Sequence, residues 1–310
     1  MELRVLGRTG LEVSALGFGG SPVGHLAVEQ GRVTEVVNQL LDAGVNLIDT
    51  AASYLGSEAA IGAAVGHRRN DYVLVSKCGQ AFDDLDGAAW SAEAITQTVD
   101  RALKRLRTDH LDVMLLHSCE LETLKNGEAV AALVAARDAG KIRFGGYSGD
   151  NEAAVYAAGL DAIDVIETSL SICDLANLDG VMAEARRRDL GVIAKRPIAN
   201  AAWKDASEQE GIYVNYAKIY SQRLEKMAIT PAALGFDGAP ADAWPEIALR
   251  FSLSLPGVSS AIVGTTKTES AKRNVEAWAK GPLPEAAVAR IRQAFSGAEA
   301  AAGETWEGRR

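Results

Sequence analysis

The sequence predicts an α/β protein in which eight strands and their helices close into a (β/α)8, or TIM, barrel. Eight short runs rich in β-branched and apolar residues recur along the chain, segments of helical periodicity separate them, and no Pro/Gly/Ser-rich linker divides the 310 residues. Strands that alternate with helices form parallel sheets, and eight such units without a linker favour one barrel over two doubly wound domains. We therefore expect residues 1–310 to form a single domain.

The first expected element is a β-hairpin that caps the barrel. Within residues 1–12, two short alternating segments flank the turn Arg8-Thr9-Gly10, and such a turn between alternating segments is typical of a hairpin. The strand candidates then follow in order: SALGF (14–18), NLIDT (46–50), DYVLVSK (71–77), LDVMLLH (111–117), RFGGYS (143–148), DVIETS (164–169), GVIAKR (191–196) and SAIVGT (260–265).

The segments between the strands are predicted helices. Over residues 95–106, Ile95, Val99, Leu103 and Leu106 recur at helical spacing, which indicates one apolar face. Residues 198–258, after the seventh strand, exceed what one crossover helix requires, so we expect a long insertion that overhangs the active face. The tail, residues 298–310, is rich in Ala, Gly and Glu and is expected to fray.

Composition limits the class of partner. The formal net charge is -9 and the pI is near 5.1, whereas nucleic-acid binding relies on clustered lysine and arginine. The chain shows no signal peptide and no apolar run long enough for a membrane helix, and its three scattered cysteines suit neither a disulfide framework nor a thiolate metal site. We expect an unprocessed cytoplasmic protein, monomeric or homo-oligomeric, that binds a small molecule and neither nucleic acid, membrane nor metal.

Polar residues end most of the strand candidates. In a barrel the carboxyl ends of the strands form the active face, and the residues that would meet there are Asp49, Lys77, His117, Ser148, Glu167, Lys195 and Arg196, with Tyr54 shortly after Asp49. Singly, each has a structural explanation, such as a helix cap for Asp49 or a solvated rim lysine for Lys77. Burying four ionisable groups from three successive strands would be costly unless they serve a function.

Asp49, Tyr54, Lys77 and His117 together supply acid-base chemistry. A phenol, with a pKa of about 10, is a weak acid at neutral pH, and a neighbouring ammonium lowers that pKa by stabilising the phenolate. A carboxylate beside the ammonium would keep it charged and in place. We therefore expect Tyr54 to deliver a proton, Lys77 and Asp49 to tune it, and His117 to orient or polarise an oxygen.

A second group of residues follows the last strand candidate. In AIVGTTKTESAKRN, residues 261–274, a strand leads through a Gly-Thr-Thr loop into a helix. Free backbone N–H groups at the helix start, threonine hydroxyls and Lys267 would suit a phosphate. The alternative is an ordinary helix start that Thr268 caps, with Glu269 in the first turn, since no GxGxxG fingerprint is present.

These motifs resemble those of the aldo-keto reductase superfamily over nearly the whole chain. LGRTGLEVSALGFGG, IDTAASY, Ser76-Lys77, the LLH that ends at His117, GGYS and IVGTTKTESAKRNVEA occur in the family's order and spacing. The resemblance implies a barrel that binds NADP(H) without a Rossmann domain and transfers a hydride to or from a carbonyl or alcohol carbon. It makes Tyr54 the general acid, tuned by Lys77 and Asp49, and makes His117 the residue that orients the carbonyl.

The resemblance also implies where the cofactor binds. Ser148 would contact the nicotinamide carboxamide, and Asn274 would contact the adenine. Loop residues after the first strand would offer backbone contacts, and those after the eighth would hold phosphate groups. The full predicted set comprises Gly20, Ser21, Asp49, Ser148, Glu167, Lys195, Arg196, Gly264, Thr265, Lys267 and Asn274.

Several positions depart from the family pattern. Glu167 replaces a glutamine of many members and cannot donate a hydrogen bond as that amide can. Lys195-Arg196-Pro197 replaces an aromatic residue that stacks on the nicotinamide, so the Arg196 guanidinium could stack instead. Ser270 replaces an arginine that binds the 2′-phosphate, and the neighbouring Glu269 would repel that group unless Lys267 and Arg273 compensate. We expect NADP(H), with NAD(H) as the open alternative.

Two other classes of protein stay open beside an aldo-keto reductase or alcohol or sugar dehydrogenase. A Schiff-base lyase would use a strand-end lysine, Lys77 or Lys195, although the Asp49 carboxylate would keep the Lys77 amine protonated. A regulatory barrel that senses NADP(H) would bind the cofactor with little turnover. The acidic loop after Lys77, residues 82–90, would disfavour anions if it overhangs the site, so we expect a small neutral aldehyde, ketone or sugar.

Overall fold

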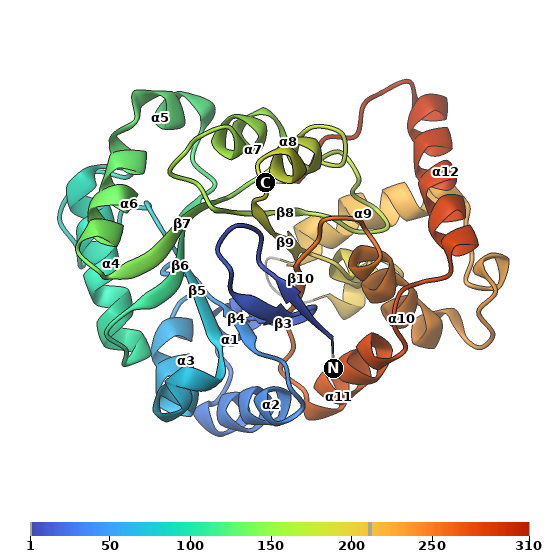
Figure 1. Ribbon diagram of the computed structural model, residues 1–310. Coiled ribbons are helices and arrows are strands. Elements are labelled where there is room, and N and C mark those ends of the chain that lie inside the picture. Colours follow the sequence, from blue (N-terminus) through green and yellow to red (C-terminus); the bar gives the residue numbers. More distant parts are fainter. Residues whose placement is uncertain (1, 210–212, 310) are drawn as a thin grey trace.

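Eight parallel strands close a barrel in sequence order. The computed structural model describes residues 2–209 and 213–309, and the order β10-β3-β4-β5-β6-β7-β8-β9 returns the last strand to the first (Figure 1). The barrel strands are β3 (Leu16–Gly19), β4 (Leu47–Asp49), β5 (Val73–Cys78), β6 (Leu111–His117), β7 (Ile142–Ser148), β8 (Val165–Ser169), β9 (Gly191–Lys195) and β10 (Ser260–Val263). The predicted (β/α)8 barrel is confirmed.

Helices on the outside connect the strands and bury one face each. In α4, Ile95 and Val99 are buried whereas Asp100 and Lys104 are exposed, and the Ser91 hydroxyl accepts a hydrogen bond from Ala94 N (3.2 Å) at the helix start. The helices are α1 (Ser21–His25), α2 (Gln30–Asp42), α3 (Ser57–Val65), α4 (Ala92–Leu106), α5 (Leu121–Asn126), α6 (Glu128–Asp138), α7 (Asn151–Ala158), α8 (Val181–Arg187), α9 (Tyr213–Met227), α10 (Pro240–Leu253), α11 (Thr268–Ala279) and α12 (Glu285–Ala302).

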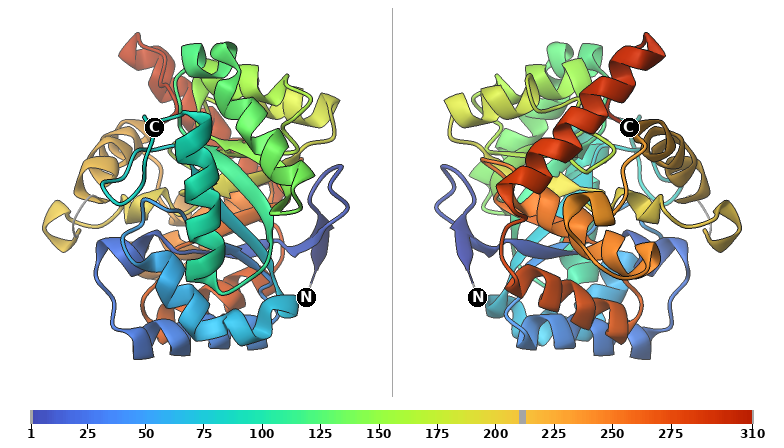
Figure 2. Two further views of the ribbon diagram at one scale, coloured as in Figure 1. Left: turned by 90° about the vertical axis from the view of Figure 1, so that its left-hand side faces the viewer. Right: turned by 90° about the vertical axis from the view of Figure 1, so that its right-hand side faces the viewer.

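The predicted N-terminal hairpin plugs one end of the barrel. Strands β1 (Leu3–Val5) and β2 (Glu12–Ser14) pair antiparallel and lie at one end in side view (Figure 2). Three hairpin side chains pack with the apolar residues that point into the barrel, and the cluster comprises Leu6, Leu11, Val13, Leu47, Val73, Val75, Val113, Leu115, Val165, Ile193 and Ile262. Because this end is filled by apolar side chains, a polar site has room only at the carboxyl ends of the strands.

The insertion between β9 and β10 lies at the end opposite the hairpin (Figure 2). It contains α9 and α10, and the Trp203 and Trp244 rings stack within it, with centroids 6.2 Å apart. At the start of α9, the Tyr213 hydroxyl lies 2.7 Å from the hydroxyl of Ser21, the first residue of α1 after β3. The insertion therefore crosses from the seventh barrel strand to the first, over the face where the strands end.

The C-terminal segment, which we expected to fray, is instead held against the barrel. Residues 298–302 complete α12, and the following Trp306 is only 4% exposed because its ring packs edge-to-face on Phe295 (5.0 Å between centroids). Gly308 N donates to Asn151 Oδ1 (2.8 Å), and Asn151 Nδ2 donates to Gly308 O (3.0 Å). The Ala/Gly/Glu-rich composition did not predict this ordered segment, because a single buried tryptophan anchors it.

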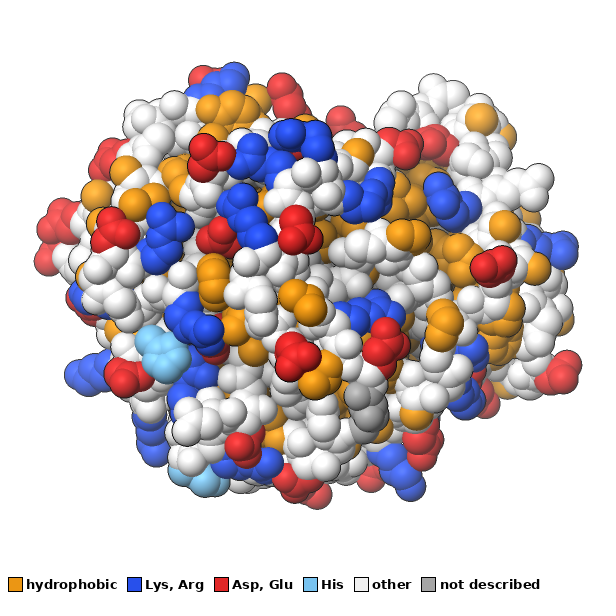
Figure 3. Space-filling model, viewed as in Figure 1, with side chains coloured by type: hydrophobic (Ala, Val, Ile, Leu, Met, Phe, Trp, Pro, Cys, Tyr) orange, Lys and Arg blue, Asp and Glu red, His pale blue; other side chains and the backbone are white. Residues whose placement is uncertain are grey.

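Acidic and basic side chains are interspersed on the face that carries the hairpin (Figure 3). This distribution contrasts with the continuous basic surface that a nucleic-acid-binding protein presents. Within residues 2–209 and 213–309, no helix combines the length and the apolar character needed to span a membrane.

Replacing Trp306 with alanine should lower the free energy of unfolding by about 3 kcal/mol, because a buried aromatic ring and its packing are lost. Trp306→Phe should retain most of the stability. Leu55→Ala, at a residue that is 76% exposed, serves as the control and should change stability by less than about 0.5 kcal/mol. Urea unfolding curves provide the measurement, and a Trp306→Ala variant as stable as the control would show that the segment is not anchored.

Candidate active site

The inward-facing residues form an apolar layer below and a polar layer above. Side chains alternate between the two faces of a strand. When a buried apolar residue of a barrel strand points inward, the residue two positions later therefore points inward too. This relation holds for Leu47 and Asp49 on β4, Val75 and Lys77 on β5, Leu115 and His117 on β6, Val165 and Glu167 on β8, and Ile193 and Lys195 on β9. Five of the predicted strand-end residues, Asp49, Lys77, His117, Glu167 and Lys195, therefore occupy one layer of the barrel interior.

A buried ion pair lies in the middle of this polar layer. Lys77 Nζ donates to Asp49 Oδ1 (2.6 Å), Asp49 Oδ2 (2.5 Å) and Thr50 O (3.1 Å), and Glu167 Oε2 lies 3.2 Å from the same nitrogen. All three ionisable residues are at most 2% exposed. Burial opposes the charge of Lys77, but Asp49 and Glu167 outweigh it and raise the Lys77 pKa. The ammonium therefore stays charged at neutral pH.

Two carboxylates share this one ammonium. Burial and the proximity of Glu167 raise the pKa of Asp49, while Lys77 acts in the opposite direction. The second carboxylate distinguishes this site from one with a glutamine at position 167.

In the described parts of the chain, no three His, Cys, Asp or Glu side chains group as they would around a metal ion.

Tyr54 lies above the ion pair, in the loop after β4. Its ring centroid lies 5.3 Å from Lys77 Nζ, and the ring packs edge-to-face against His117, with centroids 5.8 Å apart. Gly24 in α1 packs closely against this loop: a Cβ at residue 24 would lie only 2.6 Å from the Tyr54 carbonyl carbon. The loop can therefore approach α1 only because residue 24 lacks a side chain.

The protonation of Tyr54 follows from burial more than from Lys77. Burial raises the pKa of the Tyr54 phenol, and Lys77 lowers it by a smaller amount. We expected the ammonium to lower this pKa; it acts in that direction, but desolvation outweighs it. Tyr54 thus holds its proton at neutral pH, as a proton donor must.

His117 presents a neutral imidazole beside the phenol. Burial and the charge of Lys77 hold the His117 pKa well below its usual range. Its Nδ1 lies 3.3 Å from the Ser53 hydroxyl. A neutral imidazole can orient an oxygen through one ring nitrogen while the other contacts the protein.

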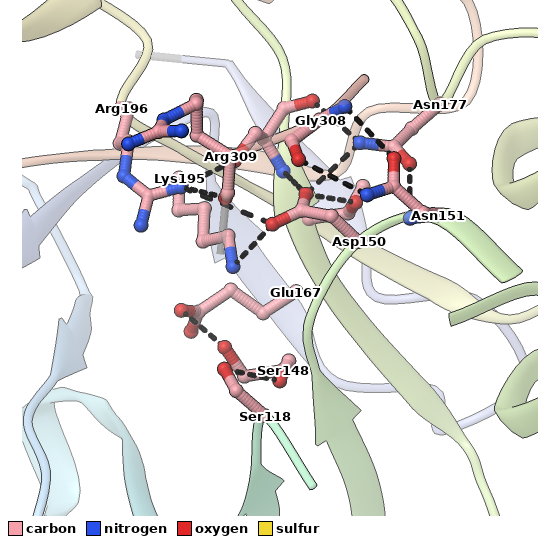
Figure 4. Close-up of polar contacts among 12 residues, drawn as sticks. Ser118, Ser148, Asp150, Asn151, Glu167, Asn177, Lys195, Arg196, Gly308 and Arg309 are labelled. Atoms are coloured by element: carbon pink, nitrogen blue, oxygen red, sulfur yellow. Dashed lines mark hydrogen bonds and ion pairs between the residues drawn. The ribbon is translucent and has the colours of Figure 1, made fainter. Parts of the chain in front are cut away.

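A second buried ion pair, not found from the sequence, joins Lys195 to Asp150 (Figure 4). Lys195 Nζ lies 2.9 Å from Asp150 Oδ2, and Asp150 Oδ1 accepts hydrogen bonds from Ser169 N (2.7 Å) and Asn177 Nδ2 (2.9 Å). Burial raises the Asp150 pKa, but Lys195 and Arg196 outweigh burial and lower it. Asp150 lies two residues after the end of β7, so a strand-end rule extended by two residues beyond Ser148 would also have found it.

Arg196 is fixed between the insertion and the C-terminal segment. Its guanidinium donates to the Ser169 hydroxyl (2.6 Å) and to Arg309 O, and lies 4.4 Å from the Tyr216 ring centroid. Residue 196 also has a positive φ of 55°, which is uncommon outside glycine. The guanidinium proposed to stack on nicotinamide thus already has one aromatic neighbour.

Ser148 and Glu167 face each other across β7 and β8. The Ser148 hydroxyl donates to Glu167 Oε1 (3.0 Å), and the two residues are opposite in the strand register. The other oxygen, Glu167 Oε2, is buried and accepts no hydrogen bond within the described residues, although Lys77 lies near it. A buried carboxylate oxygen without a hydrogen bond is costly and can accept one from a bound molecule.

The predicted phosphate-binding loop lies beside the loop after β3. A Cβ on Gly264 would lie 2.6 Å from Pro22 Cγ, so glycine permits this close approach. Gly20 N in turn donates to Asp49 O (2.7 Å), which connects this region to the buried ion pair. Helix α11 begins at Thr268, and no side chain caps its N-terminus at Lys267, contrary to the alternative of a Thr268 cap.

Asp49, Lys77 and His117 thus meet in one polar layer at the strand ends, and Tyr54 lies above them in the loop after β4. Residues 15–295 match the model of the Aldo/keto reductase family. The chain belongs to that family, and the likeness supports a nicotinamide cofactor and a small-molecule substrate.

Similar proteins cover nearly the whole chain. It is 28% identical over 292 residues to the L-galactose dehydrogenase of Arabidopsis thaliana, covering 89% of this chain and 88% of that protein. The holo form of an aldo-keto reductase from Bacillus halodurans superimposes with a TM-score of 0.79 at 25% identity, covering 95% and 96% of the two chains. An aldo/keto reductase from Klebsiella pneumoniae in complex with NADP and acetate gives 0.71 at 23% identity, with 95% and 96% coverage, and shares the fold.

Replacing Lys77 with methionine should destabilise the fold by about 3–5 kcal/mol near neutral pH, because two buried carboxylates lose their cation. Lys77 lowers the Asp49 pKa, so its removal raises that pKa further above the unfolded value. The stability that comes from the protonated carboxyl is then lost as the pH rises, and the loss relative to wild type should be larger at about pH 8 than at about pH 5.

The matched control for this variant is the double substitution Asp49→Asn with Lys77→Met, which removes one of the two carboxylates. It should recover part of the lost stability, and chemical denaturation at the two pH values gives both comparisons. A Lys77→Met penalty that does not change with pH would contradict the proposed role of the ammonium in the fold.

Proposed function

We propose that this barrel transfers a hydride between NADP(H) and the carbonyl or alcohol carbon of a small neutral substrate, with Tyr54 as the general acid or base. The observation that carries the proposal is the position of the protonated Tyr54 phenol above the buried Lys77–Asp49 pair and against His117. These groups form a proton donor without an activated nucleophile.

Each residue has one task in the proposed reduction. The substrate oxygen would lie between the Tyr54 hydroxyl and the neutral His117 ring, which orients it. As hydride reaches the carbonyl carbon, negative charge develops on that oxygen, and Tyr54 donates its proton there. Lys77 then stabilises the phenolate that remains, while Asp49 keeps the ammonium in place. The reverse sequence, with the Tyr54 phenolate as base, oxidises an alcohol.

The cofactor would extend from the buried ion pair to the start of α11. The bound dinucleotide would supply the hydride. The uncapped N-terminus of α11 can hold a phosphate through its free N–H groups, and the exposed Gly264 leaves the backbone of the preceding loop accessible. An exposed loop that leads into an uncapped helix start suits an anionic part of the cofactor.

A basic group on α11 favours NADP(H). Arg273 lies one turn into α11, and its guanidinium is 3.3 Å from the Ser270 hydroxyl. It therefore lies near the position, residue 270 in this chain, at which many family members carry an arginine. Together with Lys267 it can offset the charge of Glu269 toward a 2′-phosphate. NAD(H) is the alternative if Glu269 prevails.

The proposed substrate is neutral because the rim after β5 is partly apolar. Trp90 packs on Gly79, where an added Cβ would lie 2.0 Å from the indole ring, and Asp84 pairs with Arg101 and Arg105 of α4. An indole at the rim of a polar pocket suits a sugar or a small carbonyl compound. The name of the plant relative, L-galactose dehydrogenase, supports sugars as the first class to assay.

Schiff-base chemistry fits this site poorly. An amine nucleophile must be neutral, but the carboxylates around Lys77 raise its pKa. Lys195 is likewise paired with the buried Asp150, 2.9 Å away. Both strand-end lysines are therefore held by buried carboxylates.

Substitution of Tyr54 by phenylalanine should lower kcat by roughly 10²–10⁴-fold, since it removes the proton donor, and should leave the dissociation constant of NADPH within a factor of about two. Tyr156→Phe, at a tyrosine that is 36% exposed on α7, is the control. Turnover would be followed by NADPH absorbance with a panel of aldehydes, ketones and sugars, and binding by cofactor fluorescence.

Retention of near-normal turnover by Tyr54→Phe would refute the assignment. Tight NADPH binding by the wild type with no turnover of any substrate in either direction would instead favour the cofactor-sensing alternative.

A further inference from the structure

We infer that Glu167 makes this site select the oxidised, positively charged nicotinamide over the reduced, neutral one. The inference rests on the proposed function, because that function places the nicotinamide in the polar layer. Hydride and proton must reach the carbon and oxygen of one carbonyl group, so the nicotinamide ring has to lie within about 3.5 Å of a carbon whose oxygen contacts Tyr54. Tyr54 itself lies directly above Lys77.

The polar layer at this point carries one carboxylate more than Lys77 can neutralise. Asp49 contacts the ammonium at 2.5 Å and Glu167 approaches it at 3.2 Å. The nearby cations have partners elsewhere: Lys195 is paired with Asp150 at 2.9 Å, and the Arg196 guanidinium is turned to Ser169 and Tyr216. The Asp49–Lys77–Glu167 group thus has an excess negative charge when both carboxylates are ionised.

Glu167 also has a carboxylate oxygen that accepts no hydrogen bond within the described residues. Its Oε1 is occupied by the Ser148 hydroxyl (3.0 Å), whereas the buried Oε2 accepts no hydrogen bond in the described chain. An amide N–H₂ is a donor that can satisfy such an oxygen. A nicotinamide carboxamide provides this group in both redox states, so the hydrogen bond anchors the ring but does not distinguish the two states.

The charge of Glu167 distinguishes them. Loss of hydride turns the neutral dihydronicotinamide into a ring with one positive charge, and a buried carboxylate attracts that charge more strongly than water-exposed groups do. Hydride departs from the reduced ring with the bonding electron pair and bonds to the carbonyl carbon, while the Tyr54 proton bonds to the oxygen. Stabilising the oxidised ring therefore makes the bound reduced cofactor a stronger hydride donor.

The test compares the affinities of the two redox states in Glu167→Gln, which keeps the shape of the side chain and removes its charge. Asp49 and Lys77 stay paired in this variant, so it should fold, and thermal unfolding checks that it does. Calorimetric titration with NADP⁺ and NADPH, repeated with NAD⁺ and NADH, gives the ratio of the oxidised to the reduced dissociation constant. That ratio should rise by about tenfold, the effect expected of one unit charge at several ångströms in a partly polar interior.

Two controls separate charge from shape. Glu167→Asp keeps the charge, and its ratio should stay within about twofold of the wild type. Ser148→Ala removes a hydrogen bond without changing the charge, so it should shift both dissociation constants alike. If Glu167→Gln fails to fold, Glu167→Met supplies a second neutral variant for the same measurement.

A ratio unchanged in the neutral variants would overturn the role of Glu167, even if both cofactor forms bind. If neither form binds the wild-type protein, the proposed function itself fails, and the two failures are thus distinguishable.

Discussion

The buried contact of Lys77 with Asp49 is the interaction on which the rest of the site depends. It places a charge in a barrel whose lower interior is apolar and closed by the hairpin, where an unpaired ion would be strongly disfavoured. The strand periodicity brings the two side chains to the same interior layer, and their mutual attraction keeps them there. Tyr54, His117 and Glu167 are then arranged around this fixed positive charge.

Burial and the charge of Lys77 together set the protonation of the pocket. Burial favours the neutral forms of Tyr54 and His117; Lys77 opposes this effect on the Tyr54 pKa and reinforces it on the His117 pKa. Because Asp49, Lys77 and Glu167 are almost completely buried, these effects are large. The same ammonium therefore lies near a phenol that keeps its proton and an imidazole that stays neutral.

The sequence was sufficient for the fold and for the residues that local patterns report. Asp49, Lys77 and His117 each end an apolar run, and the barrel rule brings such residues together. The sequence could not show that burial outweighs Lys77 at Tyr54, because desolvation depends on everything packed around the ring. Nor could it show the ordered C-terminal segment, whose contacts join Gly308 to Asn151 across 157 positions of the chain. Contacts of that separation leave no periodic signal.

Closure of the barrel between its first and last strands also orders the events of protein synthesis. Strand β3 pairs with β10 through Leu16 and Ala261, Gly17 and Ile262, and Phe18 and Val263. While the ribosome is still making the middle of the chain, one edge of β3 has no partner, and unpaired edges promote association with other chains. Any sheet that forms before residue 263 has been made is therefore open along β3, and only the last strand removes that edge.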